Sequence, residues 1–405
     1  MRMAAPLKIA WFTAGLLWLA FFLNYVDRQA AFSIFPVLAR DLRFSNAQLG
    51  LIGTVFLWSY SLSMPFAGRL ADVLRRDRLA ASSVALWSLA TLGTASSGSA
   101  AAFLCWRAVT GISEALFMPA ALGLLAVWHS GDTRSRALSL FATGQFAGIA
   151  AGGWYGGWMA GHIGWRVGYA SLAIAGVGYA IVLGAVVRRP PAGPGPPKQN
   201  AAPRDVLESR TYLALSAAFF AFCFVLWVLL AWLANFLYER FHLSLADSGL
   251  RATLFLQAGT AAGVLAGGIL GDAIAVRFPG GRFYLGGTGL LFCAPFAYAM
   301  LDLGALPLLE LCCIAFGFFG GLFIANLYSS AYDVVAERNY GFAAGALNML
   351  GGAAGGAAVF LNGLVKASLG MAGLLRLGAV ATAVGAIILI TITAACFRSD
   401  HAAEL

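Results

Sequence analysis

The chain has 405 residues, of which 60% are hydrophobic and only 11% are charged, and its formal net charge is +9. Soluble domains carry roughly 45–50% apolar and about 25% charged residues, so the composition excludes both a soluble enzyme and a disordered chain. The basic residues are spread among apolar runs, which argues against nucleic-acid binding. In a membrane protein, the distribution of Lys and Arg among the loops instead predicts which side of the bilayer each loop faces.

Apolar stretches that are long enough to cross a bilayer recur along the whole chain. The twelve predicted spans are 9–31, 46–67, 79–99, 101–126, 137–160, 166–187, 211–236, 249–270, 283–300, 304–331, 341–364 and 371–396. A helix needs about 20 apolar residues to cross about 30 Å of hydrocarbon. Because these runs are continuous rather than alternating, we predict an all-α integral membrane protein with twelve transmembrane helices.

Residues 188–210 interrupt this pattern, because they hold six of the 13 prolines and five basic residues. Such a segment is typical of a semi-rigid linker on the surface. It divides the chain into an N-terminal six-helix half, 1–187, and a C-terminal six-helix half, 211–405. If both termini and the linker lie on one side, that side carries 17 of the 26 Lys and Arg residues and the other side carries seven. The positive-inside rule therefore predicts cytoplasmic termini and a cytoplasmic linker.

The two halves resemble each other at an offset of 200 residues. The coinciding pairs are Gly68 with Gly268, Asp72 with Asp272, Gly152 with Gly352, and Gly156 with Gly356. Parallel repeats on either side of a linker predict two pseudo-symmetric halves with a site near the middle of the membrane. The glycines within the spans favour packing and sliding at the interface between the two halves, since no Lys-Ser/Thr follows them as a phosphate loop would require.

Four ionisable residues lie deep within the predicted spans, namely Asp27, Arg28, Arg107 and Glu114. A charge in the middle of a bilayer costs at least a few kcal/mol, and mutual pairing of two acids with two bases can offset that cost. Arg107 and Glu114 are two helical turns apart on one face. Asp27 and Arg28 point about 100° apart, so they cannot serve the same partner in the same way.

The remaining chemistry-bearing residues give no sign of an enzyme. His129, His162, His242 and His401 fall in predicted loops or the tail, and the six cysteines form no CxxC pair. No spacing typical of a metal site and no nucleophile–base pair stands out. We therefore expect no metal and no cofactor.

The segment GRLADVLRRDR (68–78) resembles the signature between helices 2 and 3 of the major facilitator superfamily. The resemblance implies a gating latch formed by Gly68, Asp72, Arg75 and Arg76, with Asp272 as its counterpart in the second half. Gly68 would permit a close helix approach, and Asp72 would cap a helix or pair with a base. Val73 departs from the pattern, and simple anchoring to an anionic membrane surface is the alternative.

The segments NYVDR (24–28), RAVTGISEALFMPA (107–120) and WHSGDTRSRA (128–137) resemble the anion:cation symporter family within this superfamily. The resemblance implies that Asp27 and Glu114 carry coupling protons, that Arg28 binds a substrate carboxylate, and that Arg107 pairs with Asp27. A purely structural ion-pair network is the alternative. At an offset of 200, Asp27 falls on Trp227 and Glu114 falls on Ile314, so any proton chemistry would lie in the first half.

Polar residues in other spans complete the expected cavity. The resemblance supports Tyr25, Tyr60, Gln145 and Asn348 as substrate contacts, and it supports Asn326 and Ser329 less specifically. Interhelical hydrogen bonding is the alternative for each of them. The segment WLANFL (232–237) lacks a proline that the family often has. The resemblance therefore does not specify which residues of the second half line the pocket.

These observations predict a proton-coupled symporter of a small organic anion, such as a sugar acid or monocarboxylate, that works by alternating access. We expect a monomer in a bacterial inner membrane, with protons, the anion and lipid as its partners. GLIGTVFLWSY (50–60) and TRSRALS (133–139) are also similar to Spinster-like lipid transporters, so transport of a lysolipid or another amphiphile is the second reading. A non-transporting sensor lacks support.

Overall fold

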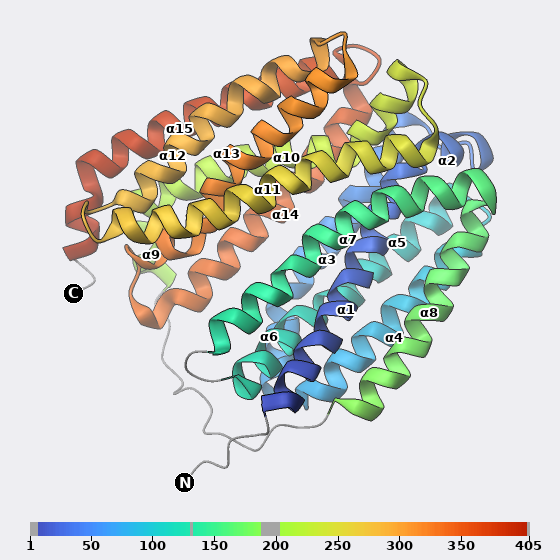
Figure 1. Cartoon of the computed structure of the whole chain (residues 1–405), viewed down its shortest axis with the longest axis horizontal. Helices are drawn as coiled ribbons and strands as arrows, with labels where there is room; N and C mark the ends of the chain where they lie inside the picture. Colours follow the sequence, from blue (N-terminus) through green and yellow to red (C-terminus); the bar gives the residue numbers. More distant parts are fainter. Residues whose placement is uncertain (1–6, 130–132, 188–202, 403–405) are drawn as a thin grey trace. The chain divides into compact units, whose positions relative to one another are not determined.

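The structure is a computed structural model that describes residues 7–129, 133–187 and 203–402. These residues form helices and no strands. The helices of the first part of the chain are α1 (Leu7–Ser33), α2 (Phe35–Asp41), α3 (Asn46–Val73), α4 (Arg76–Ala95), α5 (Ala100–Ala115), α6 (Phe117–Trp128), α7 (Arg134–His162) and α8 (Trp165–Val186) (Figure 1). Those of the second part are α9 (Pro203–Glu208), α10 (Arg210–Phe241), α11 (Leu245–Ala275), α12 (Gly281–Ala299), α13 (Leu306–Tyr332), α14 (Tyr340–Val365) and α15 (Gly370–Ala402).

Eleven of the twelve predicted spans each fall on one long helix, and the span 101–126 falls on two, α5 and α6, so the prediction of an all-α membrane fold is confirmed. Within the described ranges, ten helical segments are long and apolar enough to cross a membrane. Helices α4 and α7 do not meet this measure, since α4 begins with three charged residues and α7 is rich in glycine. Of the predicted linker, residues 188–202 lie outside the described residues, and residues 203–208 form the short helix α9.

Prolines explain two breaks that the sequence analysis did not anticipate. The span predicted at 101–126 is divided at Leu116 into α5 and α6, and Pro119 follows three residues later. A proline has no N–H to donate to the carbonyl four residues earlier, and its ring crowds that carbonyl, so the helix breaks about one turn before it. Pro36 likewise stands at the start of α2, directly after α1 ends. The first break places Glu114 in the last turn of α5.

The chain divides into two compact units, which differ slightly from the predicted halves. The first unit contains α1 to α8 together with residues 233–250, and the second contains α9, the first part of α10 and everything from residue 251 onward. Residues 233–250 group with the first unit because α11 begins in contact with α7. A Cβ atom on Gly249 would lie 1.9 Å from the carbonyl oxygen of Gly153, so this approach requires a glycine at position 249.

The starts of α3 and α11 share one local structure, which supports the predicted repeat. Arg43 and His242 both adopt the left-handed conformation, with φ of 55° and 53°. Two residues later, Ser45 Oγ accepts a hydrogen bond from the backbone N–H of Gln48, and Ser244 Oγ accepts one from that of Asp247. Both serines therefore cap a helix in the same way. This equivalence has an offset of 199, one residue less than that of the glycine and aspartate pairs.

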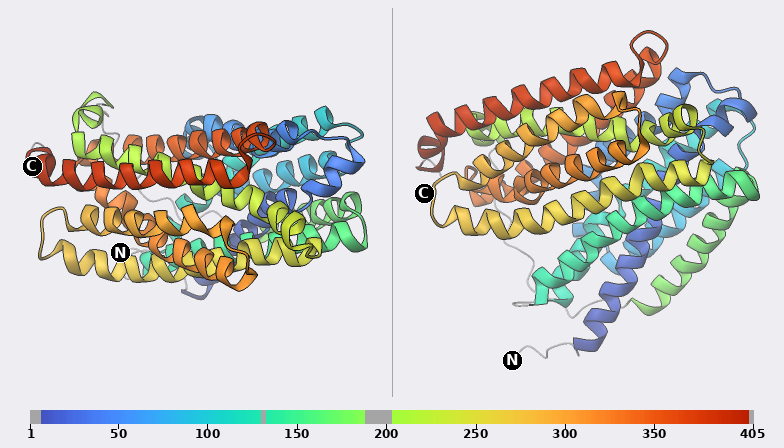
Figure 2. Two further views of the ribbon diagram at one scale, coloured as in Figure 1. Left: turned by 90° about the horizontal axis from the view of Figure 1, so that it is seen from above. Right: turned by 45° about the horizontal axis from the view of Figure 1, so that its top comes forward.

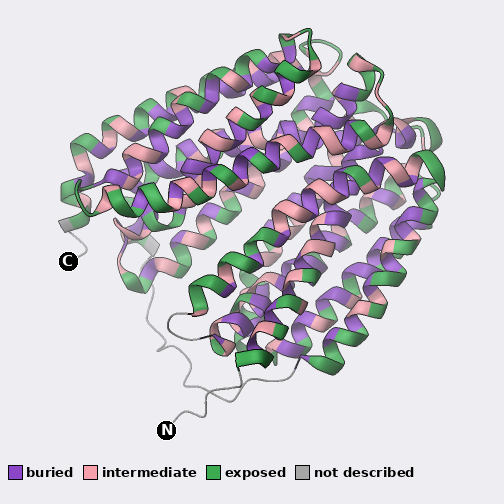
Figure 3. Cartoon of the chain, viewed as in Figure 1, coloured by how far each residue is buried: buried purple, intermediate pink, exposed green. Residues whose placement is uncertain are grey.

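Helix α7 packs directly on the backbone of α1 through its glycines (Figure 2). A Cβ atom on each would lie 2.5–3.1 Å from a carbonyl oxygen of α1. The pairs are Gly144 with Trp18, Gly148 with Phe22, Gly152 with Val26, and Gly156 with Ala30. These four glycines therefore pack closely, but against α1 of the same unit, and their placement at the interface between the halves is corrected. Along each long helix, buried residues alternate with exposed ones (Figure 3).

Candidate functional site

The four charged residues predicted within the membrane come together in the first unit. Asp27 and Arg28 lie on α1, and Arg107 and Glu114 lie on α5. Their relative exposures are 3%, 7%, 1% and 0% in that order. The two acids and two bases form a buried group without net charge, which we call the charged quartet.

Each acid of the quartet faces a base on the other helix. Arg28 Nε donates a hydrogen bond to Glu114 Oε2 at 2.6 Å. Arg107 Nη1 lies 3.6 Å from Asp27 Oδ1, which is an ion pair but too long for a hydrogen bond. The expectation that adjacent residues on α1 serve different partners is confirmed, as is the pairing of Arg107 with Asp27.

The two ion pairs differ in how completely they are hydrogen-bonded. Asp27 Oδ1, Arg107 Nε and Arg107 Nη2 are buried and have no hydrogen-bond partner among the described residues, and neither does Glu114 Oε1. Buried polar groups are satisfied in most proteins, and leaving one unsatisfied costs about 1–3 kcal/mol. The Arg28–Glu114 pair is therefore joined by a direct hydrogen bond, whereas the Arg107–Asp27 pair is held by charge alone.

Aromatic rings enclose the guanidinium group of Arg28. Its Cζ lies 4.8 Å from the ring centroid of Tyr25, 4.8 Å from that of Phe56 and 4.5 Å from that of Tyr60. Phe56 also lies 4.7 Å from Cζ of Arg107, so its ring contacts both bases. The predicted residues Tyr25 and Tyr60 thus border the quartet. Phe56 was missed, although its spacing of four residues from Tyr60 on α3 was a usable signal.

Two further residues contact the quartet without having been predicted. Thr91 Oγ1 on α4 donates a hydrogen bond to Asp27 Oδ2 at 2.5 Å. Tyr169 on α8 is fully buried, its hydroxyl has no partner among the described residues, and it interacts electrostatically with Arg107 and Asp27. Threonine and tyrosine are common in membrane helices, so nothing in the sequence distinguished these two.

The other predicted substrate contacts are not joined to the quartet by any hydrogen bond. Gln145 is half-buried on α7, and Ser329 is exposed on α13. Asn326 Nδ2 donates to the carbonyl oxygens of Gly267 and Leu322, both at 2.9 Å, and so ties α13 to α11. Asn348 Oδ1 accepts a hydrogen bond from Tyr328 at 3.1 Å. Their roles in binding substrate remain predictions.

The predicted gating motif forms a polar network where α3 meets α4. Arg76 donates to the carbonyl oxygens of Ala71 and Gly123 and pairs with Asp72 at 3.5 Å. No atom of the described residues lies within 4 Å of a Cβ atom built on Gly68. The role of Gly68 in the gating motif remains a prediction.

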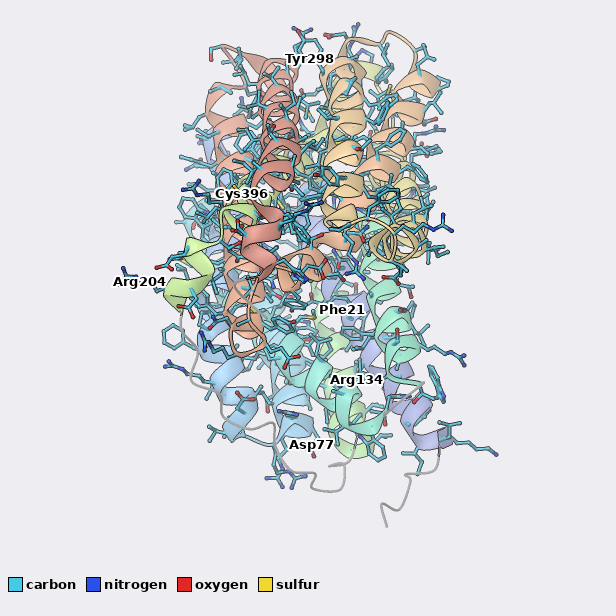
Figure 4. All side chains as sticks on the ribbon, turned by 90° about the vertical axis from the view of Figure 1, so that its left-hand side faces the viewer. Phe21, Asp77, Arg134, Arg204, Tyr298 and Cys396 are labelled. Carbon is cyan, nitrogen blue, oxygen red and sulfur yellow. The ribbon has the colours of Figure 1, made fainter. Side chains whose placement is uncertain are left out.

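Asp77 at the start of α4 belongs to the same end of the first unit (Figure 4). Arg75 Nη2 lies 2.6 Å from Asp77 Oδ2. Burial would raise the pKa of Asp77, but the Arg75 guanidinium and backbone N–H groups outweigh burial and hold that pKa below its usual range.

The second unit has a corresponding pair, since Asp272 accepts from Arg282 at 3.0 Å and Arg282 also reaches Asp333 at 3.1 Å. Burial raises the pKa of Asp333, although Arg282 acts against it. Within the described ranges, no group of three His, Cys, Asp or Glu side chains could hold a metal ion.

The model of the Major Facilitator Superfamily matches residues 17–360. The protein spinster of Drosophila melanogaster is 26% identical over 73% of this chain, and the chain spans only about half (51%) of that relative. A probable sulfoacetate transporter of Cupriavidus necator is 26% identical over 84% of each chain. A probable galactarate/D-glucarate transporter of Bacillus subtilis is 24% identical over 66% of each.

A solved structure shares the fold. The crystal structure of a bacterial homologue of the human lysosomal transporter Spinster, in an inward-facing and unoccupied conformation, aligns with a TM-score of 0.79. The alignment covers 97% of each chain at 20% identity.

Proposed function

The chain belongs to the Major Facilitator Superfamily and is therefore a membrane transporter rather than an enzyme, and from this premise we propose that it is a proton-coupled symporter of a small organic anion. Transporters of this fold work by alternating access, in which two halves rock about a site near the bilayer midplane. The charged quartet supplies the groups that such coupling needs.

The observation that carries the proposal is that Glu114 occupies only one of the three nitrogens of the Arg28 guanidinium group. Its Nε is held by Glu114 at 2.6 Å, while its two terminal nitrogens have no hydrogen bond among the described residues. A guanidinium group binds a carboxylate through two parallel hydrogen bonds. When Glu114 takes up a proton it loses its charge, and the substrate carboxylate then replaces it as the counter-ion of Arg28. Protonation and anion binding favour each other for this reason.

Asp27 is the proposed second proton site, because it lies in the same buried group and faces Arg107. The proposed hydroxyl and carboxylate contacts of the substrate are Tyr25, Tyr60, Gln145, Asn326, Ser329 and Asn348. The proposed gating latch consists of Gly68, Asp72, Arg75, Arg76 and Asp272. The monomer, the bacterial inner membrane and the cytoplasmic termini complete the proposal.

The names of several relatives support the substrate class. They include probable transporters of sulfoacetate and of galactarate/D-glucarate, and a galacturonate transporter of Dickeya chrysanthemi that is 30% identical over 35% of this chain. Each named substrate is a small organic anion with at least one carboxylate. A substrate carboxylate of this kind matches the two terminal nitrogens of Arg28, which have no hydrogen bond among the described residues.

The test is substrate-dependent proton movement in liposomes that contain a pH-sensitive dye. Sugar acids, short carboxylates, sulfoacetate and lysolipids are added one at a time. We expect one class of anion to carry protons inward, Arg28→Ala to abolish its binding, and Glu114→Gln to keep exchange but lose accumulation. Glu310→Gln is the matched control, because Glu310 is an acid of the second unit that pairs with Arg251 and not with a base of the quartet. Undiminished accumulation by Glu114→Gln would contradict the coupling role.

A Spinster-like transporter of a lysolipid or another amphiphile is the second proposal, and the 26% identity with the Drosophila spinster protein favours it. In that case lysolipids, and no small anion, would give a response, and Arg28 would contact a headgroup.

A further inference from the structure

We propose that Thr91 on α4 is a positioning residue that holds the carboxyl of Asp27 by a hydrogen bond in both its charged and its protonated form. The proposal rests on the role proposed above for Asp27 as a proton site. It assigns to α4 a part in proton coupling, although α4 contributes no charge to the quartet.

The geometry gives Thr91 two alternative acceptors for one hydrogen. Thr91 Oγ1 lies 2.5 Å from Asp27 Oδ2 and 3.0 Å from the carbonyl oxygen of Trp87. A hydroxyl group donates one hydrogen bond and can also accept. When Asp27 is charged, Thr91 donates to Oδ2. When a proton is bound at Oδ2, that O–H donates to Thr91 Oγ1, and the Thr91 hydrogen turns to the Trp87 carbonyl. The contact survives both states without movement of a heavy atom.

Burial makes this hydrogen bond important. Thr91 and Asp27 are 2% and 3% exposed, and no other hydrogen bond reaches the Asp27 side chain from the described residues. A small cavity beside the carboxyl is lined by Asp27, Thr91, Trp87, Ser88, Leu172 and Gly176. Ser88 donates its hydroxyl to the carbonyl oxygen of Val84, so Thr91 is the lining residue that bonds Asp27. Losing a hydrogen bond to a charged, buried group has a large effect.

The other charged and titratable groups around Asp27 come from three helices. Arg107 and Glu114 face it from α5, Arg28 is its neighbour on α1, and the Tyr169 phenol interacts with it from α8. Helix α4 supplies Thr91 and no titratable group to this list. Because Arg107 stays 3.6 Å away, it favours the charged form without a hydrogen bond, and Thr91 provides the direct contact.

The experiment replaces Thr91 by valine, which keeps the shape and removes the hydroxyl. The protonated Asp27 carboxyl is titrated by infrared difference spectroscopy on the purified full chain, with the band assigned by Asp27→Asn. Hydrogen bonds to a charged group are stronger than those to a neutral one, so removing the Thr91 hydroxyl destabilises the charged form of Asp27 more than its protonated form. In Thr91→Val, Asp27 should therefore bind its proton about tenfold more tightly, which moves the midpoint of its titration about one pH unit upward. The pH profile of uptake should move in the same direction.

Thr91→Ser keeps the hydroxyl and should titrate like the wild type. The matched control is Thr94→Val, because Thr94 is equally buried on α4 but donates to the carbonyl oxygen of Ala90. If Thr91→Val does not fold, Thr91→Cys, a weak donor, should give a shift between those of serine and valine. A wild-type titration for Thr91→Val, or an equal shift in Thr94→Val, would overturn the proposal. If the wild type moves no protons, the proposed function fails while the infrared titration still decides the role of Thr91.

Discussion

At the scale of single residues, the two carboxyl groups of the quartet have different partners. Glu114 is held by an arginine at 2.6 Å, and Asp27 is held by a threonine at 2.5 Å with its arginine further away. A competing anion can displace Glu114 from Arg28, but it gains nothing by displacing Asp27 from Thr91. The two proposed proton sites therefore differ in kind, since only protonation of Glu114 frees a site for substrate.

Phe56 offers a test of the aromatic enclosure at this scale. Its ring lies below 5 Å from the guanidinium carbons of Arg28 and Arg107, and such contacts are worth about 0.5–2 kcal/mol each. Loss of the contact with Arg28 in Phe56→Leu should therefore raise the KM for the transported anion by roughly two- to thirtyfold, while binding remains measurable. Phe141→Leu is the control, because Phe141 stacks on Phe21 in the same unit without contacting a base. Equal changes in KM for both variants would contradict the role of the ring.

The sequence predicts the charged quartet because a charge within an apolar span is costly and is kept only where it is paired or functional. Tyr25 and Tyr60 followed from the resemblance of their segments to a known family. Thr91, Phe56 and Tyr169 could not be found in this way, since their residue types are ordinary in membrane helices. Their importance comes from packing between α1, α3, α4 and α8, which a single sequence does not reveal.

At the scale of elements, the helices follow from the apolar runs, and their irregularities follow from proline and glycine. The break at Leu116 was missed because the run from 101 to 126 stays apolar across it, while Pro119 acts on the carbonyl one turn earlier. The glycines of α7 were correctly interpreted as packing residues, but which face each one serves needed the structure. Gly144, Gly148, Gly152 and Gly156 face α1, whereas Gly153 meets Gly249.

Gly156→Ala tests the contact between α1 and α7. Its new Cβ would lie 2.5 Å from the carbonyl oxygen of Ala30, and that backbone atom cannot turn aside. Overpacking of this kind costs roughly 1–3 kcal/mol, so the thermal unfolding midpoint in detergent should fall by several degrees. Gly161→Ala on the same helix has open space and should unfold at or slightly above the wild-type temperature. A wild-type midpoint for Gly156→Ala would contradict the close contact.

At the scale of the whole molecule, the quartet determines the charge that moves with each substrate. If Asp27 and Glu114 each carry a proton and the substrate is a monovalent anion, one net positive charge crosses the membrane per cycle. A charge gains about 2.3 kcal/mol per 100 mV, which corresponds to roughly fiftyfold accumulation. We therefore expect a potassium diffusion potential, negative inside, to increase uptake of the anion into liposomes.

Asp27→Asn is the informative comparison, because it leaves one proton site and should remove the dependence on potential while exchange continues. If uptake by the wild type is independent of the membrane potential, only one proton accompanies each monovalent anion. That result would contradict the second proton site.

The pairing of α1 with α5 also constrains how the protein is made. Asp27 and Arg28 are synthesised about 80 residues before Arg107, an interval of roughly 4 to 16 seconds at about 5–20 residues per second. Throughout that interval the first helix carries two adjacent, opposite charges whose final partners do not yet exist. Each would cost about 2.5–3.5 kcal/mol at the centre of an inserted helix. During biogenesis, then, the two charges of the first helix gain their partners only when the fourth span is inserted.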